Sequence, residues 1–123
     1  MTVAAPAAYA CRMTTEALLV VTTCENANAA RVLATELVTL RLAACVNALP
    51  QASSTYRWAG KIERSEECVL LIKTTRARLP AVTDTIKARS TYELPEILTV
   101  RVDGGSPDYL RWLETSVAPE EAT

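Results

Sequence analysis

The segment Glu66-Glu67-Cys68-Val69-Leu70-Leu71-Ile72-Lys73-Thr74-Thr75 is the clearest strand in the chain, and the elements around it decide the fold. A short apolar run between polar residues is typical of a buried strand. Three further strands are predicted on similar grounds, at residues 17–23, at residues 44–49 with a continuation over 53–58 beyond Pro50, and at residues 96–102. The pair Ala59-Gly60 makes a turn between the second and third strands.

Apolar spacing predicts helices between these strands. Residues 26–41 carry apolar side chains at helical spacing, namely Ala30, Leu33, Ala34, Leu37 and Leu40. One face of a second helix is marked by Leu79, Val82 and Ile86. A short final helix begins at Ser106-Pro107, because serine is a good N-cap and proline suits the first helical position. Its apolar and aromatic residues are Tyr109, Leu110, Trp112 and Leu113.

The order of elements predicts an α+β, ferredoxin-like β-α-β-β-α-β fold with an extra C-terminal helix and one antiparallel sheet. Right-handed crossovers place both inner helices on one face of that sheet. The other face needs cover, since Tyr56 and Trp58 are too large to leave in water, and a partner subunit is the natural cover. We expect residues 1–15 to form a disordered leader, residues 16–117 the domain and residues 118–123 a disordered tail.

Composition limits the classes of function. The 123 residues suffice for one domain. The formal net charge of −1 provides no strong field for nucleic acid or an anionic membrane. No apolar run approaches the ~20 residues of a membrane helix, and the first ten residues lack the pattern of a secretory signal. We therefore expect a cytoplasmic protein without nucleic-acid or membrane partners.

The chain has no histidine, which excludes the mixed Cys/His zinc patterns. The four cysteines are Cys11, Cys24, Cys45 and Cys68, and none forms a Cys-x-x-Cys pair. Two disulfides are allowed by the count alone, but reduced structural thiols are the favoured interpretation. Cys24 is expected to be the most exposed thiol, and a helix N-terminus beside it would lower its pKa.

Five collinear segments resemble the CutA divalent-cation-tolerance proteins, and the similarity covers about residues 18–116. The segments are Leu42-Ala43-Ala44-Cys45-Val46-Asn47, Tyr56-Arg57-Trp58-x-Gly60-Lys61-Ile62, Leu71-Ile72-Lys73-Thr74-Thr75, Tyr92-Glu93-Leu94-Pro95-Glu96-Ile97 and Ser106-x-x-Tyr109-Leu110-x-Trp112-Leu113. The resemblance implies a ferredoxin-like subunit in a tight homotrimer akin to the PII signalling proteins. It also implies a link to tolerance of divalent metals, especially copper, without an established catalytic activity.

The chain departs from this family at the expected copper ligands. The resemblance implies a thiol near the end of the first strand and histidine just before the Tyr92 segment, and the matching positions here are Val21, Arg89 and Ser90. Valine and arginine are not practical copper ligands, and serine is a poor one. No metal ligand is therefore carried over. Cu²⁺ or another divalent cation remains the candidate cofactor.

Candidate ligand-binding residues come from the same segments. We predict a polar pocket between subunits that contains Lys73, Tyr92, Glu93, Glu96 and Cys45, in which the lysine would anchor a small anion. The alternative is that the carboxylates are structural, that the lysine only reaches solvent, and that the cysteine belongs to the core. The predicted anchors of the trimer interface and core are Tyr56, Trp58 and Trp112.

Three functions remain open from the sequence. The first is a non-enzymatic trimer in the response to metal ions, which the resemblance favours, and the second is a PII-like trimer that binds a small molecule. A hydrolase or lyase that uses Glu93 or Glu96 ranks last, because no histidine base, Gly-rich phosphate loop or nucleophile elbow accompanies them. An RNA-binding sheet is disfavoured, because the strongest strand has no aromatic residue and the chain has no phenylalanine.

Overall fold

A computed structural model describes residues 15–119 and contains one four-stranded antiparallel sheet. The elements are β1 (Ala17–Cys24), α2 (Ala27–Thr39), β2 (Cys45–Trp58), β3 (Lys61–Thr75), a 3-10 turn (Arg76–Arg78), α3 (Leu79–Arg89), β4 (Leu98–Arg101) and α4 (Pro107–Ser116). The strand order is β2-β3-β1-β4, with every neighbouring pair antiparallel. This confirms the predicted α+β architecture. Most of the predicted leader and tail lies outside the described residues.

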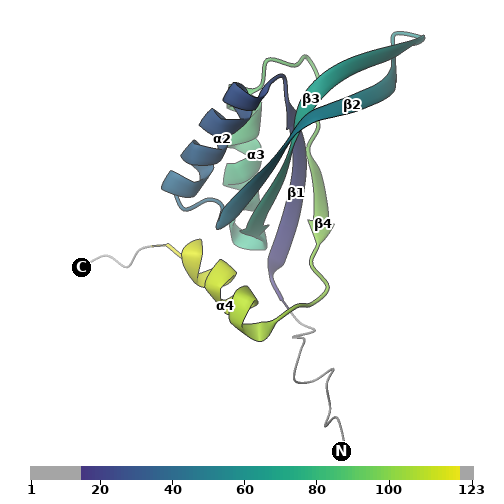
Figure 1. The fold of residues 1–123 in the computed structure, drawn as a ribbon. Coiled ribbons are helices and arrows are strands. Elements are labelled where there is room, and N and C mark those ends of the chain that lie inside the picture. The colour runs from purple at the N-terminus through teal and green to yellow at the C-terminus, as the bar shows by residue number, and fades with distance from the viewer. Residues whose placement is uncertain (1–14, 120–123) are drawn as a thin grey trace, which may run out of the picture.

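Helices α2 and α3 lie side by side on one face of the sheet (Figure 1). Alternate residues of β1 point toward them, and Leu18, Val20 and Thr22 are buried while the residues between them are only half-buried. Ile72 of β3 lies opposite Val20 and is also fully buried. The period-2 pattern of the central strands therefore places the main core between the sheet and these two helices. In the described part of the chain, no helix has the length and apolarity needed to cross a membrane.

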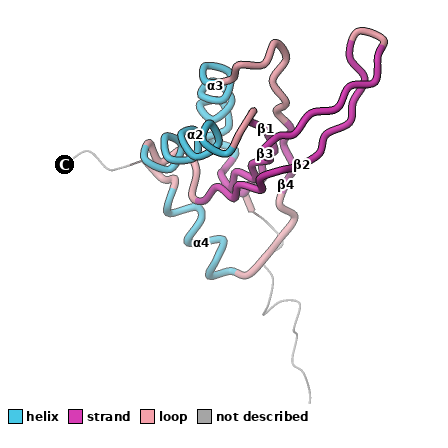
Figure 2. The backbone as a smooth tube through the Cα atoms, turned by 45° about the horizontal axis from the view of Figure 1, so that its top comes forward, coloured by secondary structure: helices cyan, strands magenta, loops and turns pink. Residues whose placement is uncertain are grey.

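The β2–β3 hairpin is longer than the sequence predicts and projects beyond the helices (Figure 2). Strand β2 continues through Pro50, because it is an edge strand with an irregularity between Leu49 and Ala52, where proline is tolerated. The predicted turn at Ala59-Gly60 is confirmed. Both residues have positive φ angles, 52° and 80°, as a two-residue type I′ turn requires.

The sheet face away from α2 and α3 carries a continuous set of apolar side chains. The residues that point to this side include Leu19, Val21, Val69 and Leu71 from the central strands, and Leu49, Leu98 and Val100 from the edge strands. Leu98 and Val100 are 59% and 49% exposed, and Leu49 is 47% exposed. We call these seven residues the open face. An apolar surface of this kind marks an interaction site.

Helix α4 packs at the end of the sheet where β1 begins (Figure 1). Its buried residues Leu110 and Leu113 cluster with Ala17, and Ser106 and Pro107 start the helix as predicted. The guanidinium of Arg41 donates to the carbonyls of Thr115 and Ala118, both at 3.1 Å, beyond the end of α2. A charged donor thus bonds the carbonyl of Thr115 in the last turn of α4 and the carbonyl of Ala118 just beyond the helix, where a positive charge is favourable.

Replacing Arg41 with alanine is expected to lower the free energy of unfolding by about 1–2 kcal/mol, because two charge-assisted hydrogen bonds to α4 are lost. Arg31→Ala is the matched control, since Arg31 of α2 bonds Asn28 on the exposed helix surface. Urea denaturation at one protein concentration measures both variants. If Arg41→Ala and Arg31→Ala lowered the free energy of unfolding equally, the bonds from Arg41 to the end of α4 would not stabilise the fold.

Candidate functional site

An open groove of about 580 Å³ lies where the hairpin leaves the body of the domain. Strand β1 supplies one lining residue at its end, and β2 and β3 supply others where they begin to project. The loop between α3 and β4 supplies the rest. The lining consists of Thr23, Ser54, Thr55, Tyr56, Trp58, Glu67, Tyr92, Glu93, Leu94 and Glu96. Segments far apart in the sequence therefore meet around one solvent-accessible space.

Glu67 of β3 is the half-buried carboxylate of this groove. Burial alone raises the pKa of Glu67, but hydrogen bonding from the side chains of Ser54, Tyr92 and Thr23 outweighs it and holds the pKa below the ordinary 4.5. Burial and the hydrogen bond to Glu67 raise the pKa of Tyr92 far above its ordinary value. Glu67 is therefore a carboxylate and Tyr92 a neutral phenol at pH 7.

Two short contacts fix the loop that carries Tyr92 and Glu96. The backbone N–H of Tyr92 donates to Ser90 Oγ at 3.1 Å, and Thr22 Oγ1 donates to the carbonyl oxygen of Glu96 at 2.7 Å. The sequence predicts that the segment from Tyr92 to Glu96 leads directly into a strand that begins at residue 96. It is instead a loop, because β4 begins only at Leu98. The loop holds Glu93 and Glu96 exposed at the groove.

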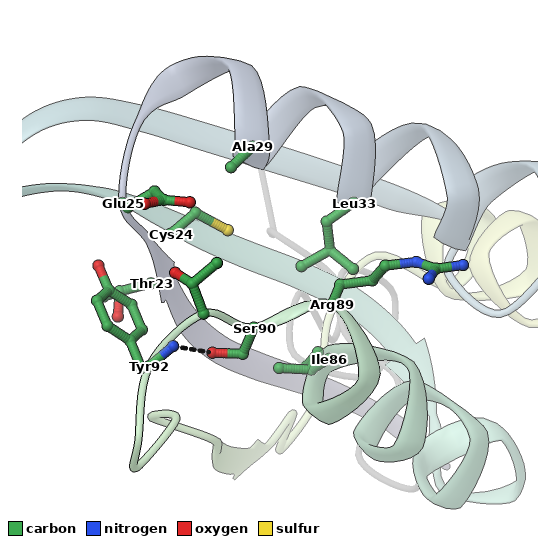
Figure 3. Close-up of a pocket in the computed structure, with 10 residues that line it drawn as sticks. Thr23, Cys24, Glu25, Ala29, Leu33, Ile86, Arg89, Ser90 and Tyr92 are labelled. Carbon is green, nitrogen blue, oxygen red and sulfur yellow. Dashed lines mark hydrogen bonds between the residues drawn. The ribbon is translucent and has the colours of Figure 1, made fainter.

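A second, much smaller cavity of about 30 Å³ lies beside the groove, between the end of β1 and the end of α3 (Figure 3). Cys24 lines it, and its pKa is raised to about 11 by burial first and then by Cys68, Glu25 and Glu67. The predicted lowering of this pKa was wrong. Cys24 still belongs to β1 and is only half-exposed, while α2 begins at Ala27. The effect of burial on the pKa of Cys24 therefore outweighs the effect of the helix N-terminus.

Lys73 and Cys45 lie away from the groove. They are opposite each other on β3 and β2, and Lys73 Nζ donates to the hydroxyl of Tyr109 on α4 at 3.3 Å. The same ammonium lies 5.6 Å from the centroid of the Tyr109 ring. Six residues of extended strand, about 20 Å, separate Lys73 from Glu67. Within the single chain the structure therefore groups Tyr92, Glu93 and Glu96, and separates them from Lys73 and Cys45.

The side chains at the three positions that correspond to the expected copper ligands have other neighbours in the structure. Val21 points to the open face opposite Leu71. Arg89 extends away from Cys24 (Figure 3). It pairs with Glu36 of α2 at 2.7 Å, and its hydrogen bond lowers the pKa of Glu36. Ser90 Oγ accepts the N–H of Tyr92. Across residues 15–119, no three cysteine, aspartate or glutamate side chains are grouped closely enough to hold a metal ion.

The predicted interface anchors separate into two regions. Tyr56 and Trp58 line the groove and are 43% and 42% exposed. Trp112 lies on α4, where its ring centroid is 5.3 Å from that of Tyr109, and is 47% exposed. Sequence reasoning did not identify Glu67, Thr23 and Ser54 as groove residues. Their strand positions gave no signal, because only the pairing of β1, β2 and β3 brings them together.

Comparisons with known proteins agree with this fold. The model of the CutA1 divalent ion tolerance protein family matches residues 18–116. Protein CutA of Mus musculus is 42% identical over 91 residues, which are 74% of this chain and 51% of the mouse protein. The divalent-cation tolerance protein CutA of Pectobacterium atrosepticum is 39% identical over 102 residues, covering 83% of this chain and 93% of that protein.

A solved structure gives the same result in three dimensions. The crystal structure of CutA from Xylella fastidiosa is 42% identical and superimposes with a TM-score of 0.82 over 85% of this chain and all of that one. The chain spans only about half the length of the mouse protein. The family model nevertheless covers residues 18–116, nearly all of the chain from β1 through α4. The chain therefore belongs to the CutA1 divalent ion tolerance protein family.

Proposed function

We propose that the chain works as a non-enzymatic homotrimer in the cellular response to divalent metal ions, copper among them. The observation that carries the trimer is the open face. Two central strands already contribute half-buried apolar side chains to it, and Leu98 and Val100 of the edge strand β4 extend it with half or more of their surface exposed. A second copy of the same chain is the simplest apolar cover for such a sheet face.

The metal role in this proposal does not depend on the copper position that the family resemblance implies. Val21 offers no donor atom, and Arg89 carries a positive charge that is already paired with Glu36. Copper ligation at Val21, Arg89 and Ser90 is therefore not part of the proposal. The cytoplasmic location predicted from composition stays a prediction.

The second candidate is a PII-like trimer that binds a small molecule, and the groove favours it. Its volume of about 580 Å³ is within the range of small-molecule sites, and it combines aromatic surface with a few polar groups. A catalytic role of Glu93 or Glu96 has less support, because the described groove residues include no cysteine, lysine or arginine beside these carboxylates. We therefore propose binding rather than catalysis at this place.

The trimer is tested by the mass of the full chain in solution. We expect a single species near three times the 13.3 kDa subunit mass by light scattering at micromolar concentration. Leu98→Glu should dissociate it, since a charge would be buried without a partner on the open face. Val32→Glu is the matched control, because Val32 of α2 is 55% exposed on the opposite side of the domain.

A monomeric wild-type chain would contradict the trimer. So would a trimer that survives Leu98→Glu but dissociates with Val32→Glu, because the contact would then lie on the helix face. Circular dichroism of both variants separates dissociation from unfolding, since a folded monomer keeps its helical signal.

A further inference from the structure

We propose that Cys24 and Cys68 form a reversible disulfide, which ties the end of β1 to β3 when the surroundings of the protein become oxidising. The two residues are direct partners in the antiparallel register of these strands. Both are free thiols in the structure. The inference concerns the interior of one chain, so it does not depend on the metal role, on the trimer or on the groove.

Both thiols lie on the sheet face that carries α2 and α3. Side chains alternate between the two faces of a strand, so Cys24 shares a side with the buried residues Val20 and Thr22, and Cys68 shares a side with the buried Leu70. Cys68 is itself buried, and Cys24 packs against the same core cluster. Figure 3 shows the Cys24 side chain pointing between the two helices. A second copy of the chain on the open face would therefore lie on the other side of the sheet from this pair.

The spacing of directly opposed residues in an antiparallel sheet suits a disulfide. Their Cα atoms lie about 4.5 or 5.5 Å apart, depending on the hydrogen bonding of the pair, and disulfides join Cα atoms that are about 4.4–6.8 Å apart. The Cβ atoms, at about 4.5–5.5 Å, must approach slightly to reach the ~3.5–4.5 Å of a disulfide. Cys24 can make this adjustment, because it is the last residue of β1 and residues 25 and 26 form a bend.

The same geometry makes the bond reversible. A disulfide that must draw two strands together stores strain, and strained disulfides are reduced more readily than structural ones. Its gain comes from the unfolded state, because the bond closes a long loop that contains α2 and β2. The strain and the gain oppose each other. We therefore expect the pair to change state within the range of a thiol buffer.

Cys45 is not an alternative partner for either thiol. It lies opposite Lys73 in the register of β2 and β3. Lys73 is about 17 Å along the strand from Cys68, and the odd number of residues between these positions puts Cys45 on the other face of the sheet. Among the cysteines of residues 15–119, Cys24 and Cys68 are therefore the pair that can bond.

A small disulfide such as oxidised glutathione is the oxidant in this proposal. The thiolate of Cys24, the more exposed of the two, attacks one sulfur of the small disulfide and releases its other half as a thiol. The thiolate of Cys68 then attacks the Cys24 sulfur of this mixed disulfide and releases the second half. The two protein thiols lose two electrons and two protons, and one small disulfide becomes two thiols.

The exchange is expected to be slow at neutral pH, because thiolate is the attacking species. Burial is the main cause that raises the pKa of Cys24 to about 11, and the neighbouring Cys68 adds to it. Burial also raises the pKa of Cys68. Little thiolate is therefore present at pH 7, and the proposal is tested at equilibrium rather than by a rate.

The test is a redox titration of the full-length chain that carries Cys11→Ser and Cys45→Ser, which leaves only the proposed pair. The protein is equilibrated at pH 8 in mixtures of reduced and oxidised glutathione with a metal chelator, and the remaining thiols are alkylated and counted by mass spectrometry. We expect both thiols to disappear in one transition, with a product about 2 Da lighter than the reduced chain. In 8 M urea the same transition should need a mixture that is at least roughly tenfold more oxidising, because the strands no longer hold the thiols together.

The matched control is the full-length chain with Cys11→Ser and Cys24→Ser. It also keeps two thiols, but Cys45 and Cys68 lie on opposite faces of the sheet. We expect it to stay reduced or to form mixed disulfides with glutathione, without a bond inside the chain.

Three results would overturn the proposal. The first is that the Cys24 and Cys68 chain forms only mixed disulfides or bonds between chains, which a non-reducing gel distinguishes. The second is an internal disulfide in the control as well, and the third is an equal transition with and without urea, since the fold would then not bring the thiols together. If the serine substitutions prevent folding, peptide mapping of the oxidised unsubstituted chain replaces the titration. It should contain a peptide that links Cys24 to Cys68, and bonds at other cysteines in its place would contradict the proposal.

Discussion

Replacing Glu67 with alanine is expected to lower the free energy of unfolding by about 1–3 kcal/mol, because hydrogen-bonding groups on three segments lose their common acceptor. Glu67→Gln should lower the free energy of unfolding by less than Glu67→Ala, since the amide oxygen still accepts one hydrogen bond. Glu66→Ala is the control on the same strand and should stay within about 0.5 kcal/mol of the wild type. Urea denaturation at fixed protein concentration measures all three.

The same carboxylate gives a pH dependence of known sign. Its folded-state pKa is below the ordinary 4.5, so the unfolded chain binds more protons in acid. Glu67 therefore stabilises the fold fully above its unfolded pKa, and this contribution is lost as the pH falls through the folded pKa. The difference between wild type and Glu67→Gln should shrink as the pH falls below the ordinary 4.5 and through the lower folded-state pKa. A difference that grows in acid would contradict the role of the three donors.

Ile72→Ala is expected to have the largest effect, a loss of about 2–5 kcal/mol in the free energy of unfolding. Ile72 is fully buried between the sheet and the helices, so the substitution leaves a cavity in the main core. Leu71→Ala gives an informative comparison, because Leu71 is the next residue on β3 and points to the open face. Thermal unfolding of both variants is measured over a range of protein concentrations.

Ile72→Ala and Leu71→Ala should differ in how their thermal unfolding depends on protein concentration. The destabilisation by Ile72→Ala should not depend on protein concentration if the variant still assembles, since it acts inside one subunit. Leu71→Ala should weaken association and make the melting temperature more dependent on concentration, because the open face is the proposed contact between subunits. Equal behaviour of Leu71→Ala and an exposed control such as Val32→Ala would argue against that contact.

Much of the fold could be predicted from local patterns. The apolar run from Val69 to Ile72 predicts a buried strand, and the helical spacing of apolar residues from Ala30 to Leu37 predicts the helix that covers it. The hairpin turn follows from Ala59-Gly60. The unbroken length of β2 could not be predicted, because whether Pro50 ends a strand depends on whether that strand lies at the sheet edge.

The candidate site was predictable only in part. The segment around Tyr92 was recognised, and the structure places Tyr92, Glu93 and Glu96 together. Lys73 was assigned to the same place because its position at a strand end suggested a polar pocket. Strand register puts Lys73 about 20 Å from Glu67 within one copy of the chain. The pocket that Lys73 would form with these residues between subunits stays a prediction. Glu67 itself gave no sequence signal, since its partners come from β1, β2 and a distant loop.

The most direct test of the proposed homotrimer is the mass of the full-length chain in solution, measured by light scattering at micromolar concentration beside the Leu98→Glu variant. We predict one species near three times the 13.3 kDa subunit mass for the wild type and a smaller, folded species for the variant. A wild-type chain with the mass of one subunit would contradict the proposal.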